Sequence, residues 1–127
     1  MDDSGERQTF DTGAVRDAAA GKPRMELISP IFERRLANWL TRGAEKYADR
    51  NWEQGIPMDR TMASLRRHVR DYREGDRSED HLAAIAANVM FLIHTEEMIE
   101  RDLLPANLND MPSYLARDPI NVTSLEA

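Results

Sequence analysis

The chain contains no cysteine among its 127 residues. This absence excludes disulfide bonds, thiolate metal ligands and a cysteine nucleophile. The sequence is also poor in aromatic residues, at 6%, and its net charge is −6. Binding to nucleic acid through bulk charge needs a surplus of cations that neutralise phosphates, and this chain has a deficit. We therefore do not expect nucleic acid to be the partner.

Long apolar runs are missing as well. No uninterrupted run approaches the roughly 18 apolar residues that a membrane-spanning helix needs. The first residues are acidic and polar, whereas a secretory signal is basic and then apolar. A chain of this length suffices for one domain with a modest core. We expect a cytoplasmic protein that makes no membrane contact.

Helical periodicity dominates what the sequence does contain. Apolar residues recur at helical spacing over residues 30–48, over residues 60–74 and from 78 to about 102. The third segment is apolar on more than one face, which is typical of a central helix. We find no internal repeat and no strong strand signal. The pattern predicts an all-α fold with a three-helix core.

Capping residues set the predicted ends of these helices. Ser29 and Pro30 provide an N-cap hydroxyl followed by a proline at the first helical position. We expect Asp59 to cap the second helix and Ser78 to cap the third. Gly75 should end the second helix, since glycine adopts the left-handed conformation that closes helices.

The remaining segments flank this core. We expect a flexible N-terminus over residues 1–12, one helical domain over 13–115 and a flexible tail over 116–127. Residues 15–20 are compatible with a turn of helix within an irregular N-terminal arm, and 103–115 with an extended segment pinned by side chains. Three helices make a thin core, so we expect a homo-oligomer to complete the bundle.

Polar residues interrupt the apolar patterns of the second and third helices. His81, Ala84 and Asn88 fall at i, i+3 and i+7 and therefore share one helical face. His68 lies at the edge of the preceding helix's apolar stripe. A short connection makes the two helices antiparallel, so we expect the imidazoles of His68 and His81 to approach each other.

Two acids precede His81 and can add hard oxygen ligands for Mg²⁺ or Mn²⁺. The alternative interpretation is that each histidine is a hydrogen-bonded residue at the edge of the core and that the acids only cap a helix. The proposed metal set is Glu79, Asp80, His81 and Asn88, and the proposed catalytic set is His68, Asp80 and His81.

A basic and aromatic cluster follows the end of the first predicted helix. Lys46 and Arg50 can neutralise phosphate. Tyr47 or Trp52 can stack on a base, and Asn51 can bond its edge. The alternative is a basic helix terminus that offsets the helix dipole, with the tryptophan filling the core.

Two further cations, Lys22 and Arg24, lie in a Gly-Pro arm that can close over phosphates. Solvated charge is the competing explanation for both. The four arginines of the second predicted helix are interpreted as a solvated face; they are Arg66, Arg67, Arg70 and Arg73.

Six short motifs follow one another over residues 13–114. They are Gly13-Ala14-Val15-Arg16-Asp17; Gly21-Lys22-Pro23-Arg24-Met25-Glu26-Leu27-Ile28; Gly43-Ala44 through Gly55; Arg67-His68; Glu79-Asp80-His81-Leu82-Ala83-Ala84 with Asn88; and Leu108-Asn109-Asp110-Met111-Pro112. In this order they resemble the phage-type dATP/dGTP diphosphohydrolase domain of the MazZ-like proteins.

The resemblance implies a helical, MazG-like nucleotide pyrophosphohydrolase of bacteriophages and prophages, acting in the host cytoplasm. Such an enzyme cleaves dGTP or dATP between the α and β phosphates with a divalent metal, yielding the monophosphate and pyrophosphate. In some phages the dGMP produced feeds the synthesis of 2-aminoadenine nucleotides for modified DNA.

The chain departs from the wider MazG pattern, which pairs Glu-x-x-Glu on one helix with Glu-x-x-Asp on a later one. Its only Glu-x-x-Glu is Glu97 to Glu100, and His81 and Ala84 stand where MazG proteins have acids. The metal assignment therefore rests on spacing. Two other functions remain open: a non-catalytic protein that sequesters a nucleotide, and an adaptor acting through the arginine-rich helix.

Overall fold

A computed structural model of the protein describes residues 5–18 and 20–115. Most of the ordered structure is helical, which confirms the all-α prediction for the core. The elements in chain order are β1 (Arg7–Thr9), β2 (Val15–Asp17), the 3₁₀ turn η1 (Met25–Leu27), α1 (Pro30–Lys46), the 3₁₀ turn η2 (Asn51–Gln54), α2 (Met58–Arg73), α3 (His81–Glu100) and the 3₁₀ turn η3 (Ala106–Leu108).

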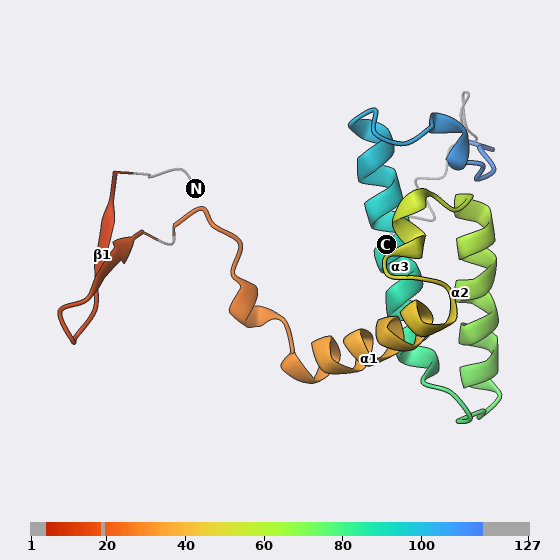
Figure 1. The fold of residues 1–127 in the computed structure, drawn as a ribbon, viewed down its shortest axis with the longest axis horizontal. Helices are drawn as coiled ribbons and strands as arrows, with labels where there is room; N and C mark the ends of the chain where they lie inside the picture. The colour runs from red at the N-terminus through yellow and green to blue at the C-terminus, as the bar shows by residue number, and fades with distance from the viewer. Residues whose placement is uncertain (1–4, 19, 116–127) are drawn as a thin grey trace, which may run out of the picture.

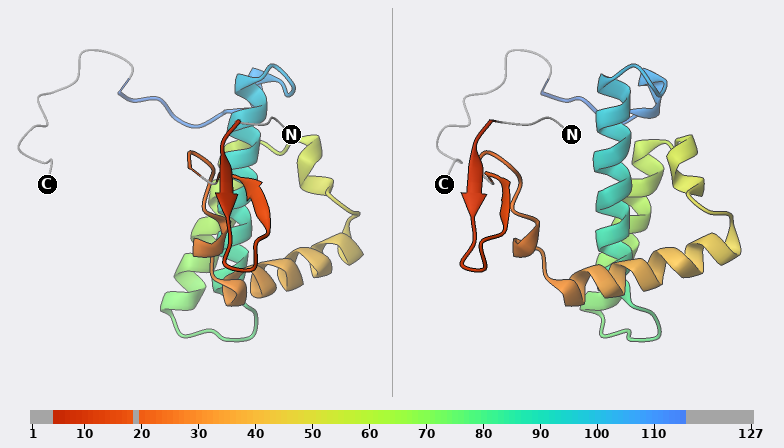
Figure 2. Two further views of the ribbon diagram at one scale, coloured as in Figure 1. Left: turned by 90° about the vertical axis from the view of Figure 1, so that its left-hand side faces the viewer. Right: turned by 60° about the vertical axis from the view of Figure 1, so that its left-hand side comes forward.

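The three helices form the body of the molecule. α2 and α3 lie side by side, and α1 crosses them near the connection between the two (Figure 1, Figure 2). α3 packs most extensively against α2 and also against α1, while η2 touches α3 as well. α3 is therefore the central helix, as its apolar pattern predicts.

The N-terminal arm contains a β-hairpin that stands away from the helices in Figure 1. β1 pairs antiparallel with β2, with Arg7 opposite Asp17 and Thr9 opposite Val15. The expected helical turn over residues 15–20 is therefore wrong, because Val15–Asp17 forms a strand. The two strands have only three residues each, which agrees with the lack of a strong strand signal in the sequence. β-Branched Thr9 and Val15 favour extended backbone, and Gly13, at φ +89°, closes the turn between them.

The two ends of the chain bear on the predicted domain limits. The strand β1 falls inside the N-terminal segment for which flexibility was expected. The predicted tail over residues 116–127 lies outside the described residues, as do residues 1–4.

Helix α1 begins as the sequence predicts. The Ser29 hydroxyl accepts a hydrogen bond from the Phe32 amide at 3.3 Å, and Pro30 occupies the first helical position. Helix α3 differs, because Asp80 is its N-cap and accepts from an amide in the first turn. The prediction that Ser78 caps α3 is wrong.

Helix α2 begins at Met58, directly after Pro57, so the expected cap at Asp59 is wrong as well. The amide of Asp59 instead donates to the Asp110 carboxylate at 2.8 Å. A carboxylate from the C-terminal segment thus takes the place of a local cap. This bond agrees with the expectation that residues 103–115 are pinned by side chains, but the segment is not extended throughout, because the turn η3 interrupts it. Gly75, at φ +94°, follows α2 as predicted.

The hydrophobic core is small. The buried apolar residues among those described are Met58, Ala83, Ala84 and Ala87. Val69, expected in the buried stripe of α2, is 36% exposed. α3 is also long and apolar enough, by length and composition alone, to cross a membrane, and only 28% of its apolar window is buried. Core helices of soluble proteins can be equally long and apolar, so length and composition do not identify a membrane span. What matters here is that much of the apolar surface of α3 is uncovered.

Candidate functional site

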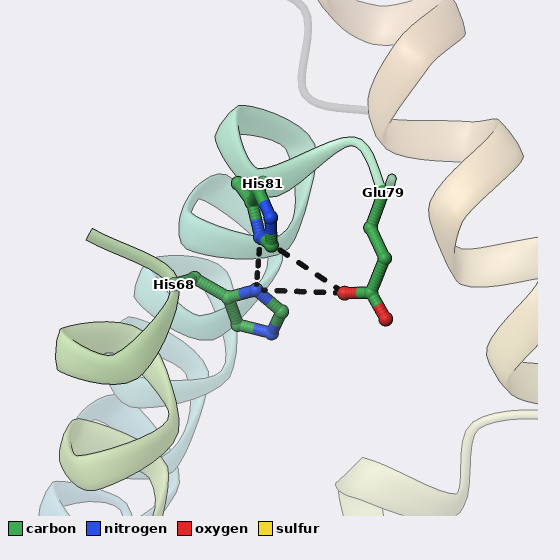
Figure 3. Close-up of side chains that lie close together, drawn as sticks. All are labelled: His68, Glu79 and His81. Carbon is green, nitrogen blue, oxygen red and sulfur yellow. Dashed lines mark hydrogen bonds and ion pairs between the residues drawn. The ribbon is translucent and has the colours of Figure 1, made fainter. Parts of the chain in front are cut away.

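The antiparallel packing of α2 and α3 brings two histidines together at the closed end of the pair. Nδ1 of His68, from α2, lies 2.9 Å from Nδ1 of His81, at the start of α3 (Figure 3). The expectation that these imidazoles approach each other is confirmed.

Glu79 completes a group of three potential metal ligands. Its Oε2 lies 3.9 Å from Nδ1 of His68 and 3.9 Å from Nδ1 of His81. In Figure 3 its carboxylate points toward the two rings from the segment that precedes α3. All three donor atoms lie within 4.8 Å of one another. Two imidazole nitrogens and one carboxylate oxygen form a donor set that fits a divalent ion.

The second ring nitrogen of His81 has its own partner. Nε2 lies 2.5 Å from Oδ2 of Asp76, and only 3% of His81 is exposed. A carboxylate accepts hydrogen bonds, so this contact places the proton of neutral His81 on Nε2 and leaves the Nδ1 lone pair facing His68. The sequence reasoning missed Asp76. A carboxylate directly after the helix-ending Gly75 was the available signal.

Burial and hydrogen bonding set the charges of these groups. Burial lowers the pKa of His68, opposed by the nearby carboxylate of Glu79, and the nearby His81 lowers it further. The pKa of Asp76 is also lowered, first by its hydrogen bond to His81 and then by one to Ser78. The site therefore combines a neutral His68 with an ionised Asp76 at neutral pH.

Asp80 is not brought into the group of three ligands. Its two oxygens accept from Arg35 of α1 at 2.6 and 2.9 Å, and one of them also accepts from the Ala83 amide. The hydrogen bond from Arg35 lowers the pKa of Asp80. Its carboxylate therefore connects α1 to the beginning of α3 and does not face the other predicted ligands.

Asn88 lies on the same face of α3 as His81, one turn beyond the fully buried Ala84. Its side chain is 8% exposed and donates to the Ser64 hydroxyl of α2 at 3.3 Å. It lines the same cleft as His68 and Glu79. The predicted polar stripe therefore reaches this cleft.

We call that space the imidazole cleft, a hollow of about 460 Å³ bounded by α1, α2, α3 and the segment before α3. Its polar walls include His68, Glu79 and Asn88, and two cations of α1, Arg42 and Lys46. Lys46 was predicted, but Arg42 was missed although it lies one helical turn earlier on the same face. Within residues 5–18 and 20–115, neither cation makes an ion pair with an acid.

A second hollow adjoins the first, and we call it the aromatic cavity. It measures about 160 Å³, and the predicted residues Tyr47, Arg50, Asn51 and Trp52 all line it. It shares four wall residues with the imidazole cleft, namely Trp39, Gly43, Tyr47 and Phe91. The two hollows are therefore neighbours along one face of α1.

The aromatic rings around this cavity differ in what they leave open. Trp52 stacks on Phe91 at 5.2 Å between ring centroids and meets His94 edge-on at 4.8 Å. These contacts fix η2 against α3, as the alternative interpretation of Trp52 holds. Tyr47 is 65% exposed, and Lys46 lies 5.2 Å from its ring centroid. Tyr47 has the more accessible ring face for an incoming base.

The two arm cations do not line either hollow. Lys22 pairs with Asp17 at 3.3 Å, and Arg24 pairs with Glu26 at 2.8 Å. Arg50 does line the aromatic cavity, although it also lies 3.8 Å from Glu53.

Comparisons with known proteins agree with the resemblance drawn from the motifs. Residues 12–102 match the family model described as dATP/dGTP diphosphohydrolase, N-terminal. A protein named dATP/dGTP diphosphohydrolase from Salmonella phage PMBT28 is 32% identical over 77 residues, which is 57% of this chain and 26% of that protein. The aligned region thus spans about a quarter of the relative's length. No solved structure matches the chain. Because the family model covers most of its length, this chain belongs to the dATP/dGTP diphosphohydrolase N-terminal family.

Proposed function

We propose that the protein hydrolyses dATP or dGTP to the monophosphate and pyrophosphate, with a divalent metal, in phage nucleotide metabolism in the host cytoplasm. The observation that carries the proposal is the adjacency of the two hollows. A ligand group of His68, Glu79 and His81 borders a cleft with cationic walls, and this cleft adjoins an aromatic cavity. A nucleotide has the matching sequence of parts, namely phosphates, sugar and flat base.

The base would occupy the aromatic cavity. The exposed ring of Tyr47 offers a stacking surface, while Asn51 and Arg50 offer hydrogen bonds to a base edge. Cavities of about 150 Å³ accept a benzene-sized ring, so a hollow of about 160 Å³ that adjoins the cleft is of the right order for a base.

The phosphates would occupy the imidazole cleft. Arg42 and Lys46 lie on its α1 wall with their charges unpaired by acids in the described part of the chain. Arginine can bind phosphate oxygens through two parallel hydrogen bonds, and lysine contributes a point charge. We assign Lys22 and Arg24 no phosphate contact in this chain, because their acidic partners lie in the same arm.

His68, Glu79 and His81 would hold the ion. The ion would supply polarisation of a phosphoryl oxygen and a lower pKa for the attacking water. Asn88, at the wall of the cleft, would orient that water or a phosphate oxygen through its amide. Both oxygens of Asp80 are bound to Arg35, so Asp80 would contribute indirectly by holding the start of α3, and with it His81, in place.

A second copy of the chain would cover the remaining apolar surface. Phe32 and Leu36 of α1 and Val89, Met90 and Ile93 of α3 line an open apolar hollow of about 500 Å³. Of the four buried apolar residues in the described ranges, three are alanines, so these ranges bury few large apolar side chains. Self-association through this groove would enlarge the core of the bundle.

The test is incubation with each deoxynucleoside triphosphate and Mn²⁺, followed by chromatography. We expect monophosphate and pyrophosphate from dATP or dGTP and little from dCTP or dTTP. His81→Ala should lower turnover by about 100-fold or more without loss of helicity. Glu100→Gln is a matched control, because Glu100 is exposed at the last residue of α3, at the end of the helix opposite His81.

Absence of pyrophosphate from every purine nucleotide would contradict the proposed reaction. Calorimetric binding of a purine nucleotide that is tight, insensitive to chelator and unaccompanied by turnover would instead identify a sequestering protein. Full activity in the His81→Ala variant would place the reaction at a different site.

A further inference from the structure

We infer that Asp76 is a positioning residue for His81, and that the His68–Glu79–His81 group it supports selects an ion such as Co²⁺, Ni²⁺ or Zn²⁺ over Mg²⁺. The inference rests on the metal site of the proposed function and deepens it by naming the class of ion. It concerns the residues of the free protein, so it can be tested without nucleotide.

The first step is the contact between Asp76 and His81. Their 2.5 Å hydrogen bond fixes the tautomer and the plane of a ring that is almost fully buried. Histidines that bind metals commonly donate their second ring N–H to a carboxylate in this way. The nitrogen left without a proton, Nδ1, is the one that faces His68 and Glu79.

The second step is the way Asp76 is itself held. Its Oδ2 accepts from the Ser78 hydroxyl at 2.9 Å, and its amide donates to the Asp71 carbonyl at 3.0 Å. Gly75, at φ +94°, makes the turn that delivers Asp76 to this place. The carboxylate is 43% exposed and lies on the opposite ring nitrogen from the ligand group, so it orients His81 and is not itself a ligand.

The third step is the chemistry of the donors. Two neutral imidazole nitrogens outnumber the one carboxylate oxygen in the group. Mg²⁺ demands oxygen ligands in near-octahedral geometry, whereas imidazole suits zinc and neighbouring transition metals. The two Nδ1 atoms are 2.9 Å apart in a hydrogen bond that His68 donates. An ion therefore meets two nitrogen lone pairs once the neutral His68 ring carries its proton on Nε2 instead, without a large movement of either helix.

The experiment is a Co²⁺ titration of the full chain without nucleotide, followed by visible absorbance and calorimetry. We expect one ion per chain, displacement by Zn²⁺ and no displacement by a large excess of Mg²⁺. Asp76→Asn should weaken Co²⁺ binding by about 10- to 100-fold and change its visible spectrum. Asp76→Glu should restore part of the affinity, and Glu100→Gln, which removes an exposed acid at the opposite end of α3, should bind as the parent does.

Two results would overturn the inference. Equal Co²⁺ affinity in the parent and in a folded Asp76→Asn variant would remove Asp76 from the site, and displacement of Co²⁺ by Mg²⁺ would remove the selectivity. If Asp76→Asn does not fold, Asp76→Glu answers the same question. A Co²⁺ spectrum that differs from the parent's in this folded variant supports a positioning role for Asp76. An unchanged spectrum and an unchanged affinity oppose it. Co²⁺ binding as expected in a protein that hydrolyses no nucleotide would support the inference and contradict only the proposed reaction.

Discussion

At the scale of single residues, two glycines near the site have opposite roles. Gly43 lies in the last turn of α1 and borders both hollows, and a Cβ added there would meet nothing within 4 Å. Gly55 has φ +103°, and a Cβ there would lie 2.7 Å from Cδ1 of Leu108. The absence of a side chain at Gly43 leaves space for a ligand. At Gly55 it allows the end of η2 to pack closely against Leu108 of the C-terminal segment.

Gly43→Leu should therefore weaken purine binding. The new side chain would project into open space at the shared wall of the two hollows, and we expect a loss of about tenfold or more, or about 1.4 kcal/mol. Both tryptophans of the chain line the aromatic cavity, so a fluorescence titration with dGTP measures the change. Gly43→Ala is the control, because it favours the helix by about 1 kcal/mol and adds only a methyl group. Equal affinity in the leucine variant would oppose the proposed binding site.

Gly55→Ala should destabilise the fold. The left-handed backbone and the close Leu108 side chain both penalise a Cβ, and we expect the free energy of unfolding to fall by about 1–3 kcal/mol. Urea denaturation followed by circular dichroism measures this loss. A variant as stable as the parent would show that the backbone after η2 adapts to a Cβ at residue 55 without loss of folding free energy.

The pairing of His68 with His81 was predictable from sequence, because both lie near a short connection between two periodic helices. Asp76 was not predictable as their partner. It is five residues from His81, outside any helical repeat, and reaches the ring only through the turn made by Gly75. Asp80 misled the prediction for a similar reason, since its partner Arg35 is 45 residues away.

At the scale of the element, the starts of α2 and α3 depend on side chains in different ways. α3 is capped by the adjacent Asp80. α2 follows a proline, and an amide in its first turn donates to the carboxylate of Asp110, which lies far along the chain. Periodicity was sufficient to predict three helices, but it carries no information about a cap supplied from 51 residues away. The short hairpin escaped prediction because its three-residue strands show no alternation long enough to recognise.

Asp110→Ala should destabilise α2. Loss of the carboxylate leaves the Asp59 amide without its partner in the first turn, at a cost of about 1 kcal/mol. Thermal denaturation monitored by circular dichroism measures the effect. Asp110→Asn is the matched variant, since its amide oxygen can still accept and most of the stability should return. An unchanged melting temperature in the alanine variant would mean that water replaces the cap.

The Arg35–Asp80 pair should make stability depend on pH in the acid range. Because the pKa of Asp80 is lower in the folded state, its contribution is fully present above the unfolded value near 3.8 and is lost as pH falls through the folded value. The pair is partly exposed, so we expect a contribution of at most about 1 kcal/mol.

Asp80→Asn retains a capping oxygen but removes the charge. The stability difference between parent and variant should be largest above about pH 5 and should shrink toward about pH 3. Melting curves across this range measure it. A difference that grows with acidity would contradict the assigned shift.

At the scale of the whole molecule, the apolar surface of α1 and α3 exceeds what the three helices cover. Ile93 is 63% exposed and Phe32 is 48% exposed, while all but one of the buried apolar residues in the described part of the chain are alanines. This imbalance was visible in the sequence as a third helix apolar on more than one face. The identity of a covering surface was not, because an apolar helical pattern does not specify what packs against it.

Ile93→Glu should therefore reduce self-association. A charge in the middle of the apolar groove would be buried without a partner, which opposes assembly by several kcal/mol. Light scattering at micromolar concentration should give more than one chain mass for the parent and a smaller mass for the variant. Val69→Glu, an exposed apolar position on α2, is the control and should assemble as the parent does. A monomeric parent would contradict the second-copy proposal.

The structure of a complex with a nonhydrolysable dGTP analogue and Co²⁺ tests the central claim most directly. The account predicts the base in the aromatic cavity against Tyr47, the phosphates near Arg42 and Lys46, and the ion on His68, Glu79 and His81. A nucleotide bound on the arginine face of α2, or an ion bound away from the two histidines, would contradict it.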